Sequence, residues 1–514
     1  MKHTFFFILC VVGLIASARA QPAIDTLFAS DLMVAPKFRS LFDSAHTVLL
    51  PRGFRCEVYY SSANFHPRSL AIGPDGGVAC SDMNAGSIYS LSENSGTGVA
   101  DTAITLAYND GGAHGFAFYH NALYTSASTY VLKYEHQNAS GLYTDSSVFI
   151  DSIPNGAEGA DNHYTRTILF DTVGKNIFLS DGSPCNACRE KDTDRATIFR
   201  YNLDGSGRSI YATGVRNAVG LSMDYQTNTL WAAVAERNNL GPDAPGDFAT
   251  RILKNGFYGW PLAYGDHQWD DFSSTAEYQA MLPITRADSL KVAGMIPPDI
   301  VAPAHSTALG VAVYRGSMFP AQYHASVFVT LHGSYNSTDG RLIANGSKII
   351  RGIPNDTGWT LADFATGFLT DSIRYQRWAR PCGIVIDSIG DLYFCSDESG
   401  AHSAPAVYKI FYEKKFSVNS PVLPNLDALR IFPDPVSRES STVEFRAELS
   451  SASSIGTLSI SDITGREIGS YKLQQVGSST YTVTLSTSEL GAGVYFARVL
   501  TNSGMLSGQF VVMK

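Results

Sequence analysis

The segment SLAIGPDGGVAC (residues 69–80) joins two short apolar runs through a turn that contains Pro74, Asp75 and glycines. Short apolar runs separated by Gly, Pro and Asp are typical of β-hairpins. The same arrangement recurs as GFAFYHNALY (115–124), TILFDTVGKNIF (167–178), VGLSMDYQTNTLW (219–231), GVAVY with VFV (310–314 and 327–329) and GIVIDSIGDLYF (383–394). A spacing of roughly 45 to 90 residues is in the range of propeller blades with loop insertions. We therefore predict an all-β fold with a six-bladed β-propeller over residues 21–412.

The composition excludes several other classes of protein. Charged residues make up 17% of the chain and hydrophobic residues 44%, which is too little charge for a disordered or coiled-coil protein. The 38 Lys and Arg residues are outnumbered by 47 Asp and Glu residues, and the net charge is −9. No basic run is present, so no nucleic acid partner is expected.

Residues 1–20 have the pattern of a secretory signal peptide. An apolar run from Phe5 to Ile15 follows Lys2, and Ala18-Arg19-Ala20 provides a cleavage site before Gln21. The run is too short to span about 30 Å of hydrocarbon, and no later stretch reaches about 18 apolar residues. We therefore predict export and no membrane span.

The C-terminal part of the chain forms a separate predicted unit. Residues 413–428 are polar and contain proline, as linkers do, and residues 429–514 alternate polar and apolar side chains with the period of strands. We predict a small β-sandwich. Three motifs occur there in order, IFPDPV (431–436), DITGRE (462–467) and LGAGVY (490–495). This tail resembles the C-terminal sorting domain of the bacterial type IX secretion system, which implies recognition by that secretion machinery; the alternative is an ordinary adhesive sandwich.

Six cysteines remain once Cys10 leaves with the signal peptide, an even number that suits an oxidising compartment. Many pairings are open, and we expect Cys185–Cys188, Cys382–Cys395 and Cys56–Cys80, the last two on neighbouring strands of one blade each. Arg189 follows the Cys-X-X-Cys motif where c-type haem needs His. No second pair is spaced for a zinc site.

Loops next to the predicted strands carry the residues suited to chemistry. His163 directly precedes a strand, and an imidazole can take up a proton near neutral pH, although a lone His is more often structural. Asp161 could orient its ring, and Arg166 could hold an anion in a bidentate pair. Other loops contribute His114, Arg216, Asn217, His305, His332 and Arg380. Their convergence on one channel predicts a site for a planar polyanion, while each could equally satisfy internal hydrogen bonds.

An acidic loop covers residues 236–247 and contains Glu236, Asp243 and Asp247 among Gly and Pro residues. Carboxylates and free carbonyl groups in such a loop suit a hard cation such as Ca²⁺. A solvated surface loop is an equal alternative.

An ordered set of motifs resembles the soluble sugar dehydrogenases that depend on pyrroloquinoline quinone (PQQ), especially the sorbosone dehydrogenase-like branch. The set consists of LPRGF (50–54), HYTR (163–166), SPCNAC (183–188), Arg216-Asn217, Gly241-Pro242, YGWP (258–261), His332-Gly333-Ser334 and Arg380-Pro381. The resemblance covers residues 50–412 and implies PQQ over the channel mouth with His163 as the general base. It implies Ca²⁺ at the carbonyl groups of Gly241 and Pro242. The cofactor contacts that we expect are His114, Arg166, Arg216, Asn217, His332 and Arg380.

The chain departs from this family at two places. His332 stands where the sugar dehydrogenases have Lys, and Asn336-Ser337-Thr338 stands where the sorbosone-like branch often has Asn-Arg. A neutral His holds a carboxylate less well than Lys does. The cofactor contacts near His332 therefore differ from those of the family.

The sequence thus predicts a secreted PQQ-dependent oxidoreductase that oxidises a sugar or a related alcohol or aldehyde, with hydride passing to the quinone. An external electron acceptor is required because no haem motif is present. One alternative is a non-catalytic binding propeller. A lactonase-type hydrolase is a weaker alternative, because its channel metal needs carboxylate ligands where these loops offer His and Arg.

Overall fold

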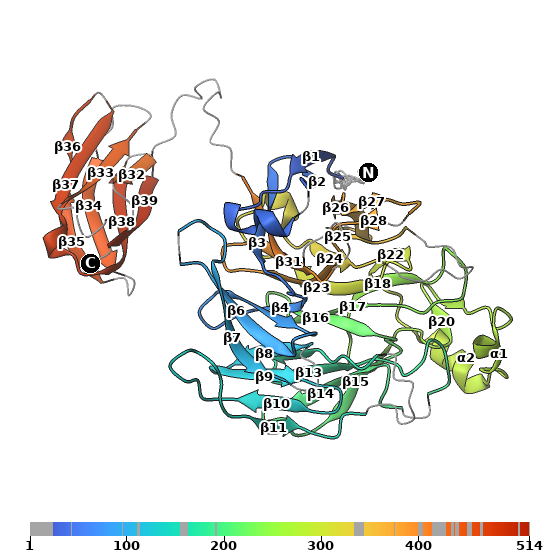
Figure 1. Ribbon diagram of the computed structural model, residues 1–514. Helices are drawn as coiled ribbons and strands as arrows, with labels where there is room; N and C mark the ends of the chain where they lie inside the picture. Colours follow the sequence, from blue (N-terminus) through green and yellow to red (C-terminus); the bar gives the residue numbers. More distant parts are fainter. Residues whose placement is uncertain are drawn as a thin grey trace, which may run out of the picture. The chain divides into compact units, whose positions relative to one another are not determined.

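The computed structural model describes two compact units, which divide after Lys414 (Figure 1). The described residues are 24–42, 44–94, 96–109, 114–154, 163–190, 193–333, 344–374, 376–398, 405–413, 428–432, 436, 442–449, 455–462, 466–477, 479–501 and 504–512. The predicted signal peptide, most of the predicted linker, Asp161 and residues 336–338 lie outside them. Both units are mostly β, and within these ranges no helix has the length and apolar character needed to cross a membrane.

Six sheets follow one another in the described part of the first unit, and the first strand of each comes from a repeated segment. In hydrogen-bonding order they are β4(Pro67–Ile72)-β5(Val78–Asp82)-β6(Ser87–Ser92)-β7(Thr102–Tyr108); β8(Phe116–Tyr119)-β9(Ala122–Ser126)-β10(Val131–Tyr134)-β11(Ser147–Ile150); β12(Ile168–Asp171)-β13(Asn176–Asp181)-β14(Thr197–Asn202)-β15(Ser209–Thr213)-β19(Gly256–Phe257); β16(Ala218–Asp224)-β17(Thr229–Val234)-β18(Gly246–Arg251)-β22(Ile300–Ala304); β23(Ala308–Val313)-β24(Val327–Leu331)-β25(Lys348–Asn355)-β26(Gly358–Ala365); and β29(Pro381–Ile386)-β30(Leu392–Ser396)-β31(Ala406–Tyr412)-β3(Phe54–Ser61).

The six first strands contact one another in a closed succession, β4, β8, β12, β16, β23, β29 and back to β4. Glycines at their starts permit this approach. A Cβ on Gly115 would lie 2.2 Å from the carbonyl oxygen of Arg166, and one on Gly310 would lie 2.5 Å from that of Cys382. A side chain at either position would push neighbouring sheets apart, which explains why glycine begins several of the repeated segments.

The last sheet is completed by β3 from the start of the unit. β3 pairs antiparallel with β31, with Phe54 opposite Tyr412, and the amide of Glu413 donates to the carbonyl oxygen of Gly53 at 2.7 Å. Aromatic rings surround Phe54 at centroid distances of 4.7 to 5.2 Å, namely those of the buried Phe319, Tyr323 and Phe364 and the partly buried Tyr412. The two ends of the unit are therefore held in one sheet.

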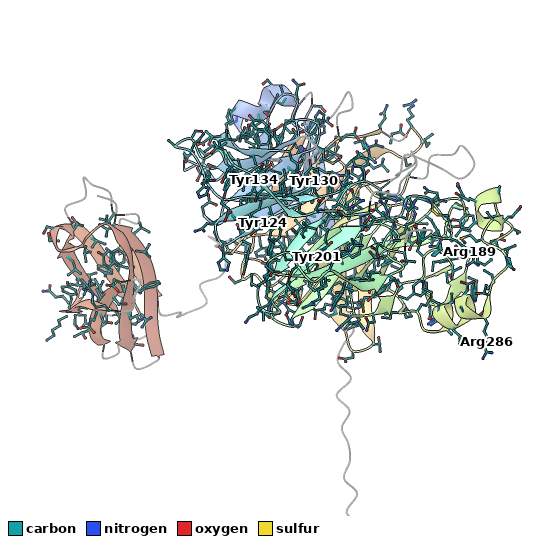
Figure 2. All side chains as sticks on the ribbon, turned by 90° about the horizontal axis from the view of Figure 1, so that it is seen from below. Tyr124, Tyr130, Tyr134, Arg189, Tyr201 and Arg286 are labelled. Atoms are coloured by element: carbon teal, nitrogen blue, oxygen red, sulfur yellow. A yellow bond between two sulfur atoms is a disulfide. The ribbon has the colours of Figure 1, made fainter. Side chains whose placement is uncertain are left out.

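An insertion between β18 and β22 carries the short helices α1(Ala276–Gln279) and α2(Arg286–Ala293). A capping box begins α2, because Thr285 Oγ1 accepts from the Asp288 amide while Asp288 Oδ2 accepts from the Thr285 amide. Arg189 pairs with Asp288 at 2.9 Å and donates to the Met281 carbonyl oxygen, so the insertion is fixed to the loop before it. Figure 2 shows Arg189 and Arg286 beside these helices.

The remaining short elements lie around these sheets. They are β1(Leu27–Asp31), η1(Pro36–Leu41), β2(Thr47–Pro51), β20(Ala263–Tyr264), β21(Gln268–Trp269), η2(Ala321–Tyr323), β27(Leu369–Asp371) and β28(Gln376–Arg377).

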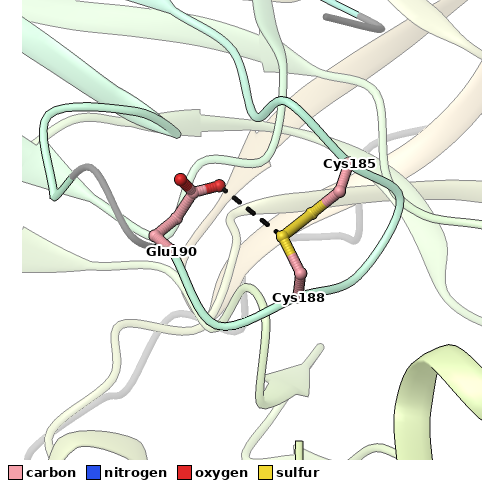
Figure 3. A group of neighbouring side chains, drawn as sticks. All are labelled: Cys185, Cys188 and Glu190. Carbon is pink, nitrogen blue, oxygen red and sulfur yellow. Dashed lines mark hydrogen bonds between the residues drawn. A yellow bond between two sulfur atoms is a disulfide. The ribbon is translucent and has the colours of Figure 1, made fainter. Parts of the chain in front are cut away.

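The cysteine predictions have a mixed outcome. Cys185 and Cys188 form the predicted disulfide (Figure 3). The other two predicted bridges are wrong, since all four of these cysteines are free and buried. Cys56 lies in β3 and Cys80 in β5, which belong to different sheets, whereas Cys382 and Cys395 do lie on the neighbouring strands β29 and β30 but remain thiols.

The second unit has its own core between two four-stranded sheets. The first is β32(Ala428–Phe432)-β33(Thr442–Glu448)-β37(Thr480–Ser486)-β36(Gln474–Gln475), and the second is β35(Glu467–Lys472)-β34(Ile455–Asp462)-β38(Gly493–Thr501)-β39(Gly504–Val512), with η3(Thr487–Glu489) between β37 and β38. Buried side chains from both sheets, such as Phe445, Ile460, Val499 and Phe510, form one cluster.

Candidate active site

A polar cavity of 580 Å³ lies at the starts of the first strands, within the range of about 300–1,000 Å³ usual for ligand pockets. Its lining includes Arg68, His163, Arg216, Asn217, Glu236, Asn238, Asp247, His305 and Asp397. A more apolar cavity of 640 Å³ runs between the first strands of all six sheets. Arg68, Val219 and Leu309 line both cavities and mark where they meet.

His163 is held by the disulfide loop. Its Nδ1 lies 2.6 Å from the carbonyl oxygen of Ser183, which can only accept, so Nδ1 carries the proton of the neutral ring. Burial, reinforced by Arg216, lowers the pKa of His163 to about 3. A neutral imidazole with this tautomer can accept a proton at Nε2. The residue expected to orient it, Asp161, lies outside the described residues.

A glycine places His163 beside Asn217, and sequence reasoning missed it. A Cβ on Gly182 would lie 2.6 Å from the His163 Cβ and 2.7 Å from Asn217 Oδ1. Gly182 follows β13 directly, and only a close backbone approach lets both side chains line the cavity here. A glycine directly after a strand of the third repeat was the available signal.

Arg216 lines the cavity while its guanidinium is anchored to the loops around it. It donates to the carbonyl oxygens of Asn186 at 3.1 Å and Glu236 at 2.8 Å and to Asn186 Oδ1 at 3.2 Å. Burial lowers the pKa of Arg216 to about 10, which leaves it charged at neutral pH. Asn186 also binds Asn238, whose amide donates to Asn186 Oδ1 at 2.7 Å.

Two of the predicted cofactor contacts, Arg166 and Arg380, lie outside the lining of the 580 Å³ cavity. Arg166 is fully buried, pairs with Asp181 at 3.2 Å and donates to the His163 carbonyl oxygen at 2.7 Å. Arg380 is 2% exposed and donates to the carbonyl oxygens of His332 and Gly333. Neither lines the 580 Å³ cavity, so both organise backbone beside the site.

The two other predicted histidine contacts lie deeper than expected. His114 lines the 640 Å³ cavity, and burial followed by the charge of Arg68 lowers its pKa to about 3. His332 is nearly buried, and its Nε2 lies 2.7 Å from Asp397 Oδ1. Burial lowers the pKa of His332 to about 4 despite the Asp397 carboxylate. His332 reaches the cavity wall through Asp397.

The predicted calcium ligands are not brought to the cavity. Gly241 and Pro242 are absent from its lining, and Pro242 is exposed. The Gly241 carbonyl oxygen lies 2.8 Å from His305 Nε2, which occupies it with a hydrogen bond. The cavity therefore does not bring these two carbonyl groups together with its other polar groups.

The acidic side of the cavity combines Glu236 and Asp247 of the predicted acidic loop with Asp397, which sequence reasoning missed together with Arg68. Asp247 accepts from the amides of Glu236 and Thr307, both at 2.6 Å, and burial raises its pKa to about 6. Asp397 pairs with Arg68 at 2.7 Å. The site therefore combines guanidinium, imidazole, amide and carboxylate groups, with the guanidinium groups anchored by hydrogen bonds and an ion pair.

Comparisons with known proteins agree with this architecture. Residues 49–402 match the family model described as TrAA12-like, and residues 430–513 match the secretion system C-terminal sorting domain. An uncharacterized protein of Borreliella burgdorferi is 24% identical over 380 residues, covering 72% of this chain and 92% of its own. The pyrroloquinoline quinone-dependent sugar dehydrogenase of Hypocrea jecorina is 23% identical over 380 residues, covering 65% and 84%.

Solved structures share the fold of the first unit. The iodide structure of the Trichoderma reesei family AA12 enzyme superposes with a TM-score of 0.58 at 17% identity, covering 77% of this chain and 99% of that one. The PQQ domain of Coprinopsis cinerea pyranose dehydrogenase superposes with a TM-score of 0.56 at 17% identity, covering 71% and 97%.

The first unit thus has a β-rich fold that it shares with a family AA12 enzyme and with the PQQ domain of a pyranose dehydrogenase. The chain belongs to the TrAA12-like family and ends in a type IX sorting domain. The sorting domain marks it as a secreted or cell-surface protein.

Proposed function

We propose that the first unit is a six-bladed β-propeller whose blades are the six sheets, and that the second unit is a β-sandwich. The closed succession of first strands and the entry of β3 into the last sheet support the first statement. The single core shared by two four-stranded sheets supports the second.

The propeller acts as a PQQ-dependent oxidoreductase on a sugar or a related alcohol or aldehyde. Arg68, Arg216 and several imidazole and amide groups face one cavity, a donor set that fits a planar quinone bearing carboxylates. Bound PQQ would supply the two-electron acceptor. A soluble external acceptor would then reoxidise it.

His163 serves as the base in this proposal. The observation that carries it is the 2.6 Å contact between Nδ1 and the Ser183 carbonyl oxygen, which fixes the tautomer with Nε2 as the acceptor. Nε2 takes the proton of the substrate hydroxyl. Arg216 and Asn217, anchored around the same cavity, bind and orient the ligand.

In this proposal Ca²⁺ is only an expected requirement for activity. A calcium structure exists for the Trichoderma reesei AA12 neighbour. In this chain the Gly241 carbonyl oxygen lies 2.8 Å from His305 Nε2, and Gly241 is absent from the cavity lining, so we assign no step to the ion.

The deciding experiment titrates the EDTA-treated full-length protein with PQQ, with and without Ca²⁺, and follows the quinone absorbance and dye reduction with a panel of sugars. We expect a saturable spectral change and sugar-dependent dye reduction. Absence of the spectral change contradicts the proposal. Lactone hydrolysis without PQQ would instead support the hydrolase, and carbohydrate binding without oxidation would support a binding propeller.

A further inference from the structure

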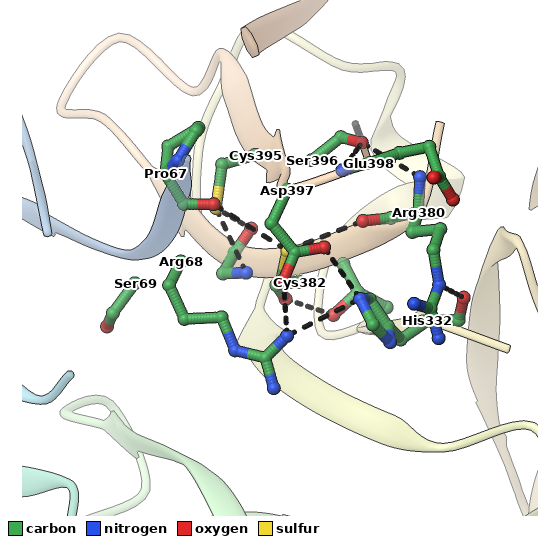
Figure 4. A network of polar contacts seen from close by, with 12 residues as sticks. Pro67, Arg68, Ser69, His332, Arg380, Cys382, Cys395, Ser396, Asp397 and Glu398 are labelled. Atoms are coloured by element: carbon green, nitrogen blue, oxygen red, sulfur yellow. Dashed lines mark hydrogen bonds and ion pairs between the residues drawn. The ribbon is translucent and has the colours of Figure 1, made fainter. Parts of the chain in front are cut away.

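A compact set of three different metal-binding side chains lies where the two cavities meet (Figure 4). His332 follows β24, Cys382 lies in β29 and Asp397 follows β30. An imidazole nitrogen, a thiol sulfur and a carboxylate oxygen of these residues all lie within 4.8 Å of one another. Neighbouring blades therefore bring three unlike donors together from positions far apart in the sequence.

We propose that His332, Cys382 and Asp397 form a binding site for a soft divalent cation of the Zn²⁺ class. Imidazole nitrogen, thiolate sulfur and carboxylate oxygen are the donors that Zn²⁺ takes in proteins, at about 2.0–2.3 Å. Tetrahedral geometry at such bond lengths separates the donors by about 3.5 Å. The present separations of up to 4.8 Å must therefore shorten when the cation binds.

The groups that would support these ligands are already in place. Arg68 Nη1 donates to Asp397 Oδ2 at 2.7 Å, and His332 Nε2 lies 2.7 Å from the other carboxylate oxygen, Oδ1. Arg380 Nε donates to the carbonyl oxygen of His332 at 3.1 Å and fixes its backbone. Hydrogen bonds to ligating carboxylates and their neighbours are the usual means by which proteins orient metal ligands.

Binding changes the protonation of this set in a simple way. The cation replaces the proton between His332 Nε2 and Asp397 Oδ1, and that proton moves to His332 Nδ1. The Cys382 thiol releases its proton to solvent as the thiolate forms. Once Asp397 binds the cation, the charge of Arg68 is no longer compensated, which favours water or a small anion at the fourth coordination position.

An entry path is available from both cavities. Asp397, whose side chain is 22% exposed, lines the 580 Å³ cavity, and Cys382 lines the 640 Å³ cavity. The other described group of candidate ligands, Cys185, Cys188 and Glu190, is ruled out as a thiolate site because its two sulfurs form the disulfide (Figure 3).

The test is a Co²⁺ titration of the EDTA-treated full-length protein without PQQ, so its outcome does not depend on oxidoreductase activity. We expect one Co²⁺ per chain, a thiolate-to-cobalt charge-transfer band in the near ultraviolet, and displacement by Zn²⁺. Cys382→Ser should abolish the band, and Asp397→Asn should weaken Co²⁺ binding by at least about tenfold.

Cys56→Ser is the matched control, because it removes a buried free thiol in β3 that does not belong to the set. It should keep the band. The proposal is overturned if the wild type shows no band, if the band survives in Cys382→Ser, or if Cys56→Ser loses it. Should Cys382→Ser fail to fold, Asp397→Asn decides, and unchanged Co²⁺ affinity there contradicts the site.

Discussion

His163 Nδ1 lies 2.6 Å from the carbonyl oxygen of Ser183, and Ser183 Oγ donates to the carbonyl oxygen of Cys185 at the same distance of 2.6 Å. The orientation of the imidazole thus depends directly on the loop that the Cys185–Cys188 disulfide closes. A base whose tautomer is set by backbone does not need a carboxylate partner.

Replacing His163 by Ala should lower kcat for dye reduction by about 10²–10⁴-fold, the usual contribution of a general base. PQQ binding should persist, because Arg68, Arg216 and Asn217 still line the cavity. Stopped-flow absorbance measurements distinguish PQQ binding from dye reduction. His324→Ala, at an exposed site outside both cavities, should behave as wild type. Equal activity in both variants would remove His163 from the mechanism.

Gly182→Ala should lower kcat while the fold is kept, since the new Cβ would lie 2.6 Å from the His163 Cβ and displace the ring. Gly294→Ala is a suitable control because its Cβ would meet only ordinary contacts at 3.6 Å or more. Activity and circular dichroism measured together check this. Wild-type kcat in Gly182→Ala would show that the ring position is not critical.

The pH profile of kcat/KM should lack an inflection near pH 6.5. Burial and Arg216 lower the pKa of His163 to about 3, so the ring stays neutral, and able to accept a proton, as the pH falls from 7.5 to 5. Measurements of kcat/KM between pH 5 and 7.5 with saturating electron acceptor test this prediction. A fall to half of the maximum between pH 6 and 7 that persists in Asp247→Asn, which removes a carboxyl group of pKa about 6 from the same cavity, would mean that His163 titrates normally.

Asn186→Ala should weaken PQQ binding about tenfold and lower the melting temperature. The substitution leaves Arg216 Nη2 and the Asn238 amide without their shared acceptor, and each buried unpaired group costs roughly 1–3 kcal/mol. Asn94→Ala, which removes an exposed amide, is the control. Calorimetric titration with PQQ compares the affinities of the two variants. Identical affinities would show that Asn186 in the disulfide loop does not influence PQQ binding.

Asp391→Asn should stabilise the protein at pH 7 by roughly 1–3 kcal/mol. Burial, with Asp387 nearby, raises the pKa of Asp391 to about 6, and within the described residues its Oδ1 has no hydrogen-bond partner. Because the pKa is raised in the folded state, the free energy of unfolding of the wild type increases as the pH falls through 6 towards 4. This gain is absent above pH 6, where Asp391 is charged.

The gain in unfolding free energy from Asp391→Asn should therefore become smaller as the pH falls from 7 to 4. Urea unfolding at several pH values measures it, with Asp266→Asn as the exposed control. A constant difference between the Asp391 variant and the wild type across this range would contradict the raised pKa.

The hairpins of the first unit were predictable because their pattern is local. A short apolar run predicts each first strand, and glycines such as Gly115 and Gly310 indicate close backbone contacts. Helix α2 was also predictable, since Thr285 and Asp288, three positions apart, have the spacing of a capping box. The pairing of β3 with β31 has no local signal, because it joins opposite ends of the unit.

The candidate site was predictable as a set of loops but not as a set of contacts. The residue types showed that Arg166 and Arg380 are charged. They did not show that both side chains are buried, Arg166 paired with Asp181 and Arg380 hydrogen-bonded to backbone carbonyl groups. The cysteine count suggested pairs, yet Cys56 and Cys80 belong to different sheets. Burial and partnership depend on tertiary packing, which spacing along the chain does not encode.

The entry of β3 into the last sheet sets an order for folding and processing. Arg55 and Glu413, which form an ion pair beside this seam, are 358 positions apart. The seam cannot close until the whole unit has been synthesised, and contacts of such long range slow folding. Every strand of the six sheets nevertheless ends by Tyr412. A protease that cuts beyond Glu413 therefore removes the sorting tail without taking a strand from any of them.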